Sequence, residues 1–314
     1  MLALTSATGK LGSAVISAIL ENNLIDPKDL VICSSSPPTH PHLTHLLTTH
    51  PTLTLRHADF TTPSTLAPAF TSCTSLFLVS TPAIHLDYNN APPGQGREAH
   101  HIPAIDTALA AGVRHIYYTS LAFGNPSKAG VMRAHIRTEA YLRELEAKGK
   151  CKVTVIREGL YNESWPLYFG YYYGLKEEKR KEVLVAGDGR VCWTSITDLG
   201  FATARILATD SEEWAGKMVY LSQRRGVTFG EIAGVVSKAK GEEVRLKIVD
   251  RKAYEDFYVG EMGMERAAVE WWSSTYEALE EGECEIDDGT LEGLLAEVGR
   301  KPKQIEETIE EMMK

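Results

Sequence analysis

The first twelve residues constrain the fold more than any other part of the chain. An apolar run, LALT at residues 2–5, meets a turn of small residues, SATG at residues 6–9, and an apolar helix pattern follows. Strand, tight turn and helix in this order are typical of a dinucleotide-binding βαβ unit, whose turn N–H groups and helix N-terminus hold a pyrophosphate. Ordinary α/β proteins also carry such turns, so the motif alone leaves nucleotide binding open.

Three residues of this turn carry specific expectations. Gly9 would let the backbone approach a phosphate closely, and Gly12 would let the helix pack tightly on the sheet. Ser6 stands where the usual pattern has its first glycine. A serine suits that position only if the turn needs no positive φ.

Composition excludes several classes of protein. The chain has 314 residues, of which 43% are hydrophobic and 24% charged, as in a soluble globular protein. A net charge of −9 argues against nucleic-acid partners. No apolar run approaches the ~20 residues of a membrane span, and no secretory signal is expected. The five cysteines are scattered and lack CxxC spacing, which predicts reduced thiols in a cytoplasmic protein.

The first half of the chain alternates strand and helix signals. Apolar or β-branched strand patterns occupy residues 2–5, 30–33, 53–57, 76–79, 115–118 and 153–156, with helix patterns between them. This alternation predicts an α/β fold, a Rossmann-type doubly wound parallel sheet. We assign residues 1–157 to that domain, with sheet contributions from about 190–222, and residues 158–314 to a smaller, mainly helical substrate lobe. In the second part, helices are expected from the capping residue Asp198 to Leu207 and near Thr228, Ala253, Glu265, Thr290 and Pro302.

Two loops are predicted. Residues 34–51 hold four histidines without an acidic ligand, so we favour a solvated loop and expect no metal site. Residues 82–96 follow the fourth strand, at the sheet edge where doubly wound folds bind ligands. A loop of that length is either mobile or lies over a site.

With these elements placed, the chain resembles the NmrA-like group of atypical short-chain dehydrogenase/reductases, in particular the quinone oxidoreductase type. Their order and spacing carry the resemblance: the motifs are residues 5–12, 57–60, 110–113, 118–121, 157–163, 186–189, 197–198, 216–220 and 299–302. It implies an NADP(H)-binding protein. The implied cofactor-binding residues are Thr5, Ser6, Thr8, Gly9, Lys10, Leu11, Gly12, Ser34, Ser35, Asp59, Phe60, Ser80, Thr81, Pro82, Thr119 and Gly159.

Several of these residues have an alternative structural role. Asp59, expected beside the adenine with Phe60, could instead cap the helix that starts after Thr61. Residues 80–82 and 119–120, expected near the nicotinamide end, could simply end their strands. Arg157 could serve in an ion pair rather than in the site.

The end of the second strand departs from the family pattern. It carries Cys33-Ser34-Ser35-Ser36, where an acidic residue would bind the ribose of NAD and an arginine the 2′-phosphate of NADP. Because no carboxylate is present to repel a phosphate, NADP(H) is preferred over NAD(H). Serine hydroxyls and Lys10 are the expected donors, with weaker binding than an arginine would give.

The catalytic segment departs further. The Tyr-x-x-x-Lys pair of ordinary members is absent, and His135-Ile136-Arg137-Thr138-Glu139 stands in its place. His135 is a candidate proton donor because its reference pKa of ~6.5 suits neutral pH, although a pairing with Glu139 across one helical turn is favoured. Ser120 and Tyr161 complete the candidate catalytic set.

Residues 165–174 are the most aromatic stretch and form either a wall for a flat substrate or a core between lobes. Of Trp271 and Trp272, one is expected in the core of the lobe. The leading hypothesis is an NADPH-dependent reductase of a quinone or similar conjugated carbonyl compound. The alternative is a non-catalytic NADP(H)-binding redox sensor acting through a regulatory protein partner, and a homodimer stays open. An isomerase or reductase of secondary metabolism cannot be separated from the first hypothesis by sequence.

Overall fold

The computed structural model describes residues 1–171, 175 and 178–314. Its main feature is a seven-stranded sheet whose paired strands all run parallel. In spatial order the strands are β3 (Thr54–His57), β2 (Leu30–Ser34), β1 (Leu2–Leu4), β4 (Ser75–Leu78), β5 (His115–Leu121), β6 (Lys152–Glu158) and β8 (Met218–Leu221). The predicted doubly wound sheet is therefore confirmed, and the strand order reverses between β1 and β4. Ligands bind such folds at this reversal, beyond the carboxyl ends of the strands.

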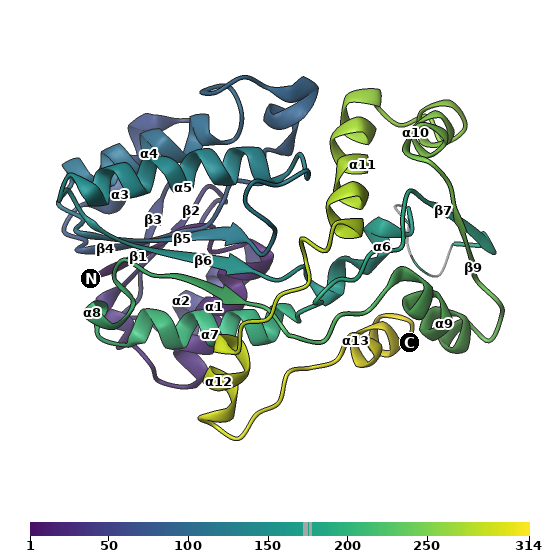
Figure 1. Ribbon diagram of the computed structural model, residues 1–314. Helices are drawn as coiled ribbons and strands as arrows, with labels where there is room; N and C mark the ends of the chain where they lie inside the picture. Colours follow the sequence, from purple (N-terminus) through teal and green to yellow (C-terminus); the bar gives the residue numbers. More distant parts are fainter. Residues whose placement is uncertain (172–174, 176–177) are drawn as a thin grey trace.

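Helices cover both faces of the sheet, and the buried strands are correspondingly apolar. One face carries α3 (Leu66–Phe70), α4 (Glu98–Ala110) and α5 (Met132–Ala147) (Figure 1). The opposite face carries α1 (Lys10–Glu21), α2 (Pro41–Thr49), α7 (Ile196–Ala208) and α12 (Thr290–Ala296), with the short α8 (Ser211–Trp214) at the end of the sheet. Single 3₁₀ turns are η1 (Pro27–Asp29), η2 (Pro63–Thr65) and η4 (Asn162–Ser164), and η3 (Ile84–Asn90) is longer.

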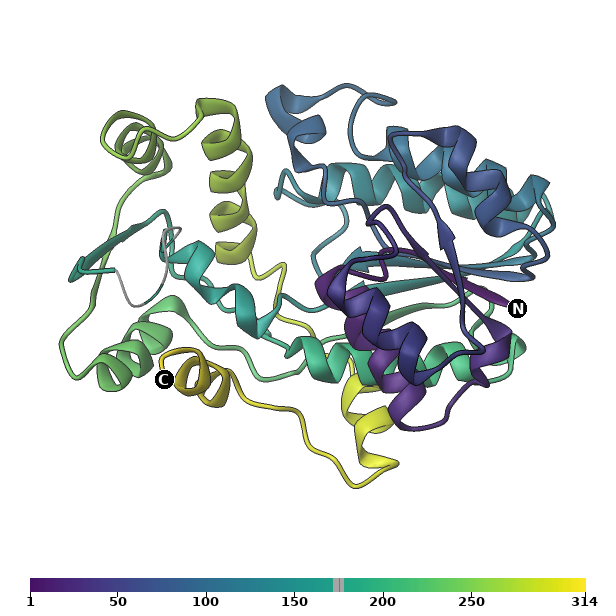
Figure 2. The same ribbon diagram turned by 180° about the vertical axis from the view of Figure 1, so that it is seen from behind.

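A second group of elements lies beyond the carboxyl edge of the sheet, as both views show (Figures 1 and 2). It contains α6 (Trp165–Tyr168), α9 (Phe229–Lys240), α10 (Arg251–Gly260), α11 (Arg266–Glu280), α13 (Ile305–Met312) and a two-stranded parallel sheet of β7 (Glu182–Val185) and β9 (Arg245–Ile248). Its apolar cluster is separate from the two clusters that flank the main sheet. The chain thus holds a substantial apolar core on each side of the carboxyl edge.

Two local predictions were wrong. The histidine-rich segment is not a loop throughout, because α2 begins at Pro41 and buries Leu43 and Leu46 on one face. Helix α7 starts earlier than expected: Ser195, not Asp198, is the N-cap, and the Asp198 side chain lies in the first turn. Within the described residues, no cluster of three potential metal ligands is found, and no helix is long and apolar enough to cross a bilayer.

Candidate functional site

The turn between β1 and α1 is closed by backbone contacts around Ser6. Gly9 N–H donates to the Ser6 carbonyl oxygen at 2.8 Å, and Ser6 has a φ of +58°. The condition under which a serine suits this position is therefore not met, and Ser6 adopts a conformation that costs an L-residue about 1 kcal/mol. A Cβ at position 12 would lie 2.1 Å from the Ser6 oxygen, so only glycine fits there. The result is a tight turn without side chains at Gly9 and Gly12, at the N-terminus of α1.

Hydroxyl groups gather where β1 and β2 end. Thr8 Oγ1 lies 3.0 Å from Ser36 Oγ and 3.4 Å from Ser34 Oγ. Ser35 and Lys10 are exposed beside this cluster in the chain. None of the five residues is acidic, so the group offers donors to a phosphate without repelling it. Ser36 was not among the predicted site residues, although the serine run after the second strand signalled it.

Two predicted cofactor residues tie neighbouring strands together. Thr5 Oγ1 donates to the Phe77 carbonyl oxygen at 3.2 Å and accepts from Val79 N–H at 2.9 Å. Thr119 Oγ1 accepts from Ser80 N–H at 2.9 Å. Both hydroxyls are buried. They therefore hold the carboxyl edge in shape, and their direct contact with a cofactor stays a prediction.

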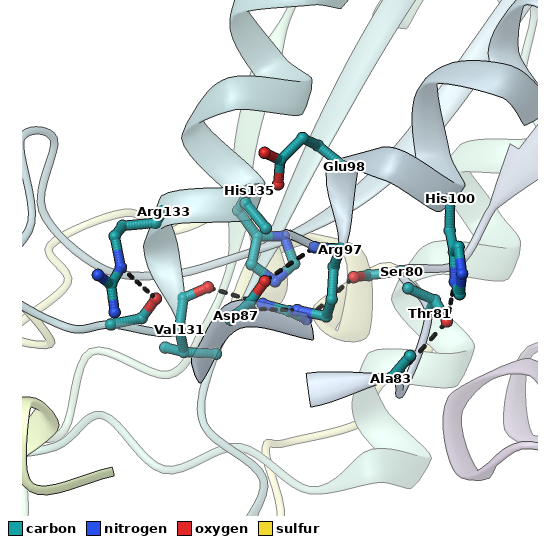
Figure 3. Close-up of polar contacts among 12 residues, drawn as sticks. Ser80, Thr81, Ala83, Asp87, Arg97, Glu98, His100, Val131, Arg133 and His135 are labelled. Carbon is teal, nitrogen blue, oxygen red and sulfur yellow. Dashed lines mark hydrogen bonds and ion pairs between the residues drawn. The ribbon is translucent and has the colours of Figure 1, made fainter. Parts of the chain in front are cut away.

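Arg97 anchors the segment that follows β4 (Figure 3). Its guanidinium donates from Nε to Asp87 Oδ2 at 2.6 Å, from Nη1 to Ser80 Oγ at 3.2 Å and from Nη2 to the Val131 carbonyl oxygen at 2.7 Å. Arg97 and Asp87 are both buried. Ser80 Oγ also lies 3.2 Å from His101 Nε2. The ion pair joins η3 to the N-terminus of α4, and the bond to Val131 extends this link to the N-terminus of α5. These residues were not predicted because nothing in sequence spacing links them.

The predicted adenine pair shows local contacts. Asp59 Oδ1 accepts from Thr61 N–H at 2.8 Å and from Thr61 Oγ1 at 2.7 Å, and these bonds hold the pKa of Asp59 below its usual value. Phe60 stacks on His100 with ring centroids 6.5 Å apart. Asp59 thus closes a turn after β3, close to the capping role considered as the alternative.

A cavity of about 540 Å³ opens between the carboxyl edge and the second group of elements. The sheet side supplies residues that end or follow β4, β5 and β6, including those of η3, and the second group of elements supplies residues of α6, α10 and α11. The lining is mostly aromatic and aliphatic: Pro82, Ile84, Tyr88, Leu121, Phe123, Val131, Gly159, Leu160, Tyr161, Ser164, Leu167, Tyr168, Tyr254, Tyr258, Met264, Ala268, Val269, Trp271, Trp272 and Thr275. The predicted loop at 82–96 therefore borders a cavity, through Pro82 and η3.

The aromatic stretch is divided between the two roles that were considered. Leu167 and Tyr168 line the cavity, whereas Trp165 and Phe169 belong to the apolar core. Tyr172–Gly174 lie outside the described residues. Trp271 and Trp272 both line the cavity, and Trp272 also packs against the apolar cluster of this region.

Two candidate catalytic residues lie away from the cavity lining. Ser120 Oγ donates to Glu139 Oε1 at 2.6 Å, and Glu139 forms a two-point ion pair with Arg157 at 3.0 and 2.8 Å. The proposed pairing of His135 with Glu139 is therefore wrong, and Arg157 serves in an ion pair. His135 Nδ1 instead lies 3.0 Å from the Tyr118 hydroxyl.

The environment of His135 also changes its chemistry. Burial, followed by the nearby Arg97, His101 and Arg157 charges, lowers its pKa well below 6.5. Its imidazole is therefore neutral near pH 7, and the protonated form that made it a candidate donor is scarcely populated there. Donation by His135 stays a prediction without that support.

Tyr161 is the predicted catalytic residue that lines the cavity. Its hydroxyl donates to Glu158 Oε2 at 2.9 Å. Glu158 is buried at the end of β6. Burial raises its pKa to about 8 and outweighs the hydrogen bond from Tyr161, which lowers the pKa. The nearby Gly159 cannot carry a side chain, since a Cβ would lie 2.4 Å from Thr194 Oγ1 and 2.8 Å from Ser222 Oγ. Glu158 lies in the segment 157–161 that the family resemblance places at the nicotinamide end, but it was not among the predicted catalytic residues, although a carboxylate ending an apolar strand was a visible signal.

These features define an α/β protein of the doubly wound, dinucleotide-binding type, with an apolar cavity at the carboxyl edge of its sheet. The chain belongs to the NmrA-like family, which matches residues 1–309. An NmrA-like family domain-containing oxidoreductase of Aspergillus flavus is 30% identical over 307 residues, which cover 95% of this chain and 90% of that protein. Quinone oxidoreductase 2 of Escherichia coli is 28% identical over 250 residues, covering 78% and 76%.

Solved structures share the fold over its full length. The structure of an NADPH-dependent quinone oxidoreductase from Escherichia coli, complexed with NADPH, matches with a TM-score of 0.78, 23% identity and coverage of 100% of both chains. The triphenylmethane reductase of Citrobacter sp., complexed with NADP(H), matches with a TM-score of 0.75, 23% identity and coverage of 99% of both chains.

Proposed function

We propose that this protein is an NADPH-dependent reductase that delivers a hydride to a flat conjugated carbonyl compound, such as a quinone. The observation that carries the proposal is the aromatic cavity of about 540 Å³ at the carboxyl edge of a doubly wound sheet. Flat rings gain about 1 kcal/mol per aromatic contact beyond area burial, so such walls suit a conjugated substrate. Relatives that are named oxidoreductases support the same class of reaction.

The residues at the cofactor end fit a phosphorylated dinucleotide. The bare turn at Gly9 and Gly12 leaves room for a pyrophosphate at the N-terminus of α1, where no side chain caps the helix. Thr8, Ser34 and Ser36 would donate to a 2′-phosphate. NADPH, when bound, supplies the hydride, while the protein supplies orientation and a water-poor cavity.

Binding is tested first, by calorimetric titration with NADPH and separately with NADH. We expect micromolar binding of NADPH and clearly weaker binding of NADH. Gly9→Asp should abolish NADPH binding without unfolding the chain, because the carboxylate blocks the turn and repels phosphate. Gly234→Asp is the matched control, since Gly234 lies exposed in α9 with open space around it. Unchanged affinity in Gly9→Asp would refute the site.

Turnover is tested next, by following NADPH oxidation over a panel of quinones and other conjugated carbonyl compounds. Oxidation that saturates with one acceptor class supports the reductase. Tight NADPH binding without oxidation of any acceptor would instead favour the non-catalytic redox sensor.

A further inference from the structure

A buried carboxyl group lies directly behind the cavity wall. Glu158 is 2% exposed, and its Oε2 accepts the hydrogen bond from the Tyr161 hydroxyl at 2.9 Å. Its other oxygen, Oε1, is buried and has no hydrogen-bond partner within the described part of the chain. Tyr161 is partly exposed and lines the cavity. A protein carboxyl is thus linked to the cavity through one phenol.

The surroundings of Glu158 favour its protonated form. The adjacent strands place Leu121 and Leu221 beside it in register. Arg157 points to the opposite face of β6, because side chains alternate along a strand, and it is paired there with Glu139. An unpaired carboxylate without a cation is costly to bury, and burial accordingly raises the pKa of Glu158 to about 8.

One further acid lies near this pair. Glu163 adds negative charge near Tyr161, and burial and Glu158 together with this charge raise the pKa of Tyr161 well above 10. The Glu163 carboxylate accepts from Ile196 N–H at 3.2 and 3.3 Å, at the start of α7. Neither Tyr161 nor Glu158 is therefore expected to ionise at neutral pH, and both hold a proton there.

We propose that Tyr161 and Glu158 together form the proton donor of the reaction, with Tyr161 giving its hydroxyl proton to the acceptor oxygen and Glu158 replacing it. The proposal rests on the proposed function, since only a hydride acceptor needs this proton. Tyr161 is the catalytic residue, and Glu158 is the positioning residue that acts through it.

The step balances in atoms and electrons. Hydride brings two electrons and one hydrogen to the conjugated acceptor, which leaves a negative charge on its oxygen. The Tyr161 O–H bond breaks and a new O–H bond forms on that oxygen. Once Tyr161 has lost its proton, the 2.9 Å hydrogen bond reverses, so that the protonated Glu158 donates to the phenolate oxygen and passes its proton to it. The resulting carboxylate takes a proton from water after product leaves. The sensor alternative has no use for such a pair.

Glu158→Gln and Tyr161→Phe test the proposal, each compared with wild type across the pH range with one acceptor. Glutamine keeps the shape and an acceptor for the phenol but has no acidic proton. We expect each variant to lose about 100-fold in kcat below pH 8 with a smaller change in KM, as general-acid catalysis predicts. The double variant should lose no more than either single one, because the two groups act as one unit.

The pH profile separates this role from a structural one. Wild-type kcat should fall above about pH 8, as Glu158 loses its proton. This alkaline limb of the pH profile should vanish in Glu158→Gln. Glu163→Gln is the matched control: it keeps an acceptor for Ile196 N–H and should retain the limb. A Glu158→Gln enzyme with the wild-type rate and an unchanged limb would overturn the relay while leaving the proposed function standing.

Infrared spectroscopy gives a readout that needs no turnover. The cofactor-free protein should show a protonated-carboxyl band that disappears as pH passes about 8, is missing in Glu158→Gln and shifts in Tyr161→Phe. Absence of that band would refute the proposal even in an active enzyme. If the wild-type protein fails to oxidise NADPH with every acceptor of the panel, the proposed function fails. The relay then fails with it, whatever the infrared band shows.

Discussion

At the scale of single residues, polar side chains at the carboxyl edge divide into those that hold the edge and those that face the cavity. The hydroxyls of Thr5, Thr119 and Ser120 are bonded within the protein and none of these residues lines the cavity. Tyr161 lines the cavity, and its hydroxyl is bonded to Glu158. All four end or follow a strand, so sequence could place them at the edge. Which way each side chain points depends on strand register and on partners from distant segments, and sequence spacing does not reveal those.

Ser6 carries a conformational cost that glycine would remove. We expect Ser6→Gly to raise the free energy of unfolding by about 1 kcal/mol, since its φ of +58° is unfavourable for an L-residue. Denaturant unfolding measures the change. Ser13→Gly, inside α1, should instead destabilise by about 0.5 kcal/mol because glycine is a poor helix former. Equal destabilisation by the two variants would contradict the strain at Ser6.

Ser35 is the position at which charge would discriminate between the two cofactors. Ser35→Arg should tighten NADPH binding about tenfold and leave NADH binding unchanged, because a guanidinium pairs with a phosphate through charged hydrogen bonds. Ser35 is exposed, so the longer side chain meets no packing constraint. Paired calorimetric titrations give the ratio of affinities. An equal gain for both dinucleotides would place the 2′-phosphate elsewhere.

At the scale of secondary structure elements, the sheet could be predicted and the cavity wall could not. Buried parallel strands are apolar throughout, which makes β2 and β4 visible in sequence. Helix α2 was missed because its two buried leucines, Leu43 and Leu46, stand among threonines and histidines that are typical of loops. The cavity wall is built by α10 and α11, which long-range packing brings to the sheet edge. No local pattern encodes that contact.

Helix α11 offers a direct test of the cavity. Ala268→Phe should fill part of it and raise KM for the acceptor at least tenfold, while NADPH affinity stays unchanged, because Ala268 lines the cavity on the side away from the sheet. Ala267→Phe is the matched control, since Ala267 precedes Ala268 in the same helix and is not part of the cavity lining. Steady-state kinetics gives KM for the acceptor, and calorimetry gives the affinity for NADPH. An equal rise of KM for the acceptor in both variants would indicate damage to α11 rather than a smaller cavity.

At the scale of the whole molecule, the cavity lies between two separately packed regions, and both supply residues to its lining. The sheet side presents Tyr161 with Glu158 behind it, and the far side presents Tyr168, Trp271 and Trp272. An acceptor bound between them would bury apolar surface against both regions at once. The proposed reaction would therefore depend on how the two regions pack together, because neither region encloses the cavity alone.

The buried Glu158 carboxyl ties global stability to pH. Its pKa is near 4.5 in an unfolded chain and about 8 in the native protein, so the native state binds the proton more tightly. This contribution to stability is fully present below about pH 4.5 and is lost as pH rises through about 8. Between those values it should fall by ~1 kcal/mol per pH unit.

Other groups act in the opposite direction, so the difference between two proteins isolates this effect. His135 and Glu178 have lowered pKa values and favour the native state at higher pH. Glu158→Gln keeps those groups and removes the titration of Glu158. The stability of wild type relative to this variant should therefore decrease steadily from about pH 5 to about pH 8 in urea unfolding. A difference that stays flat would mean that Glu158 is ionised in the native protein, and the proton behind Tyr161 would not exist.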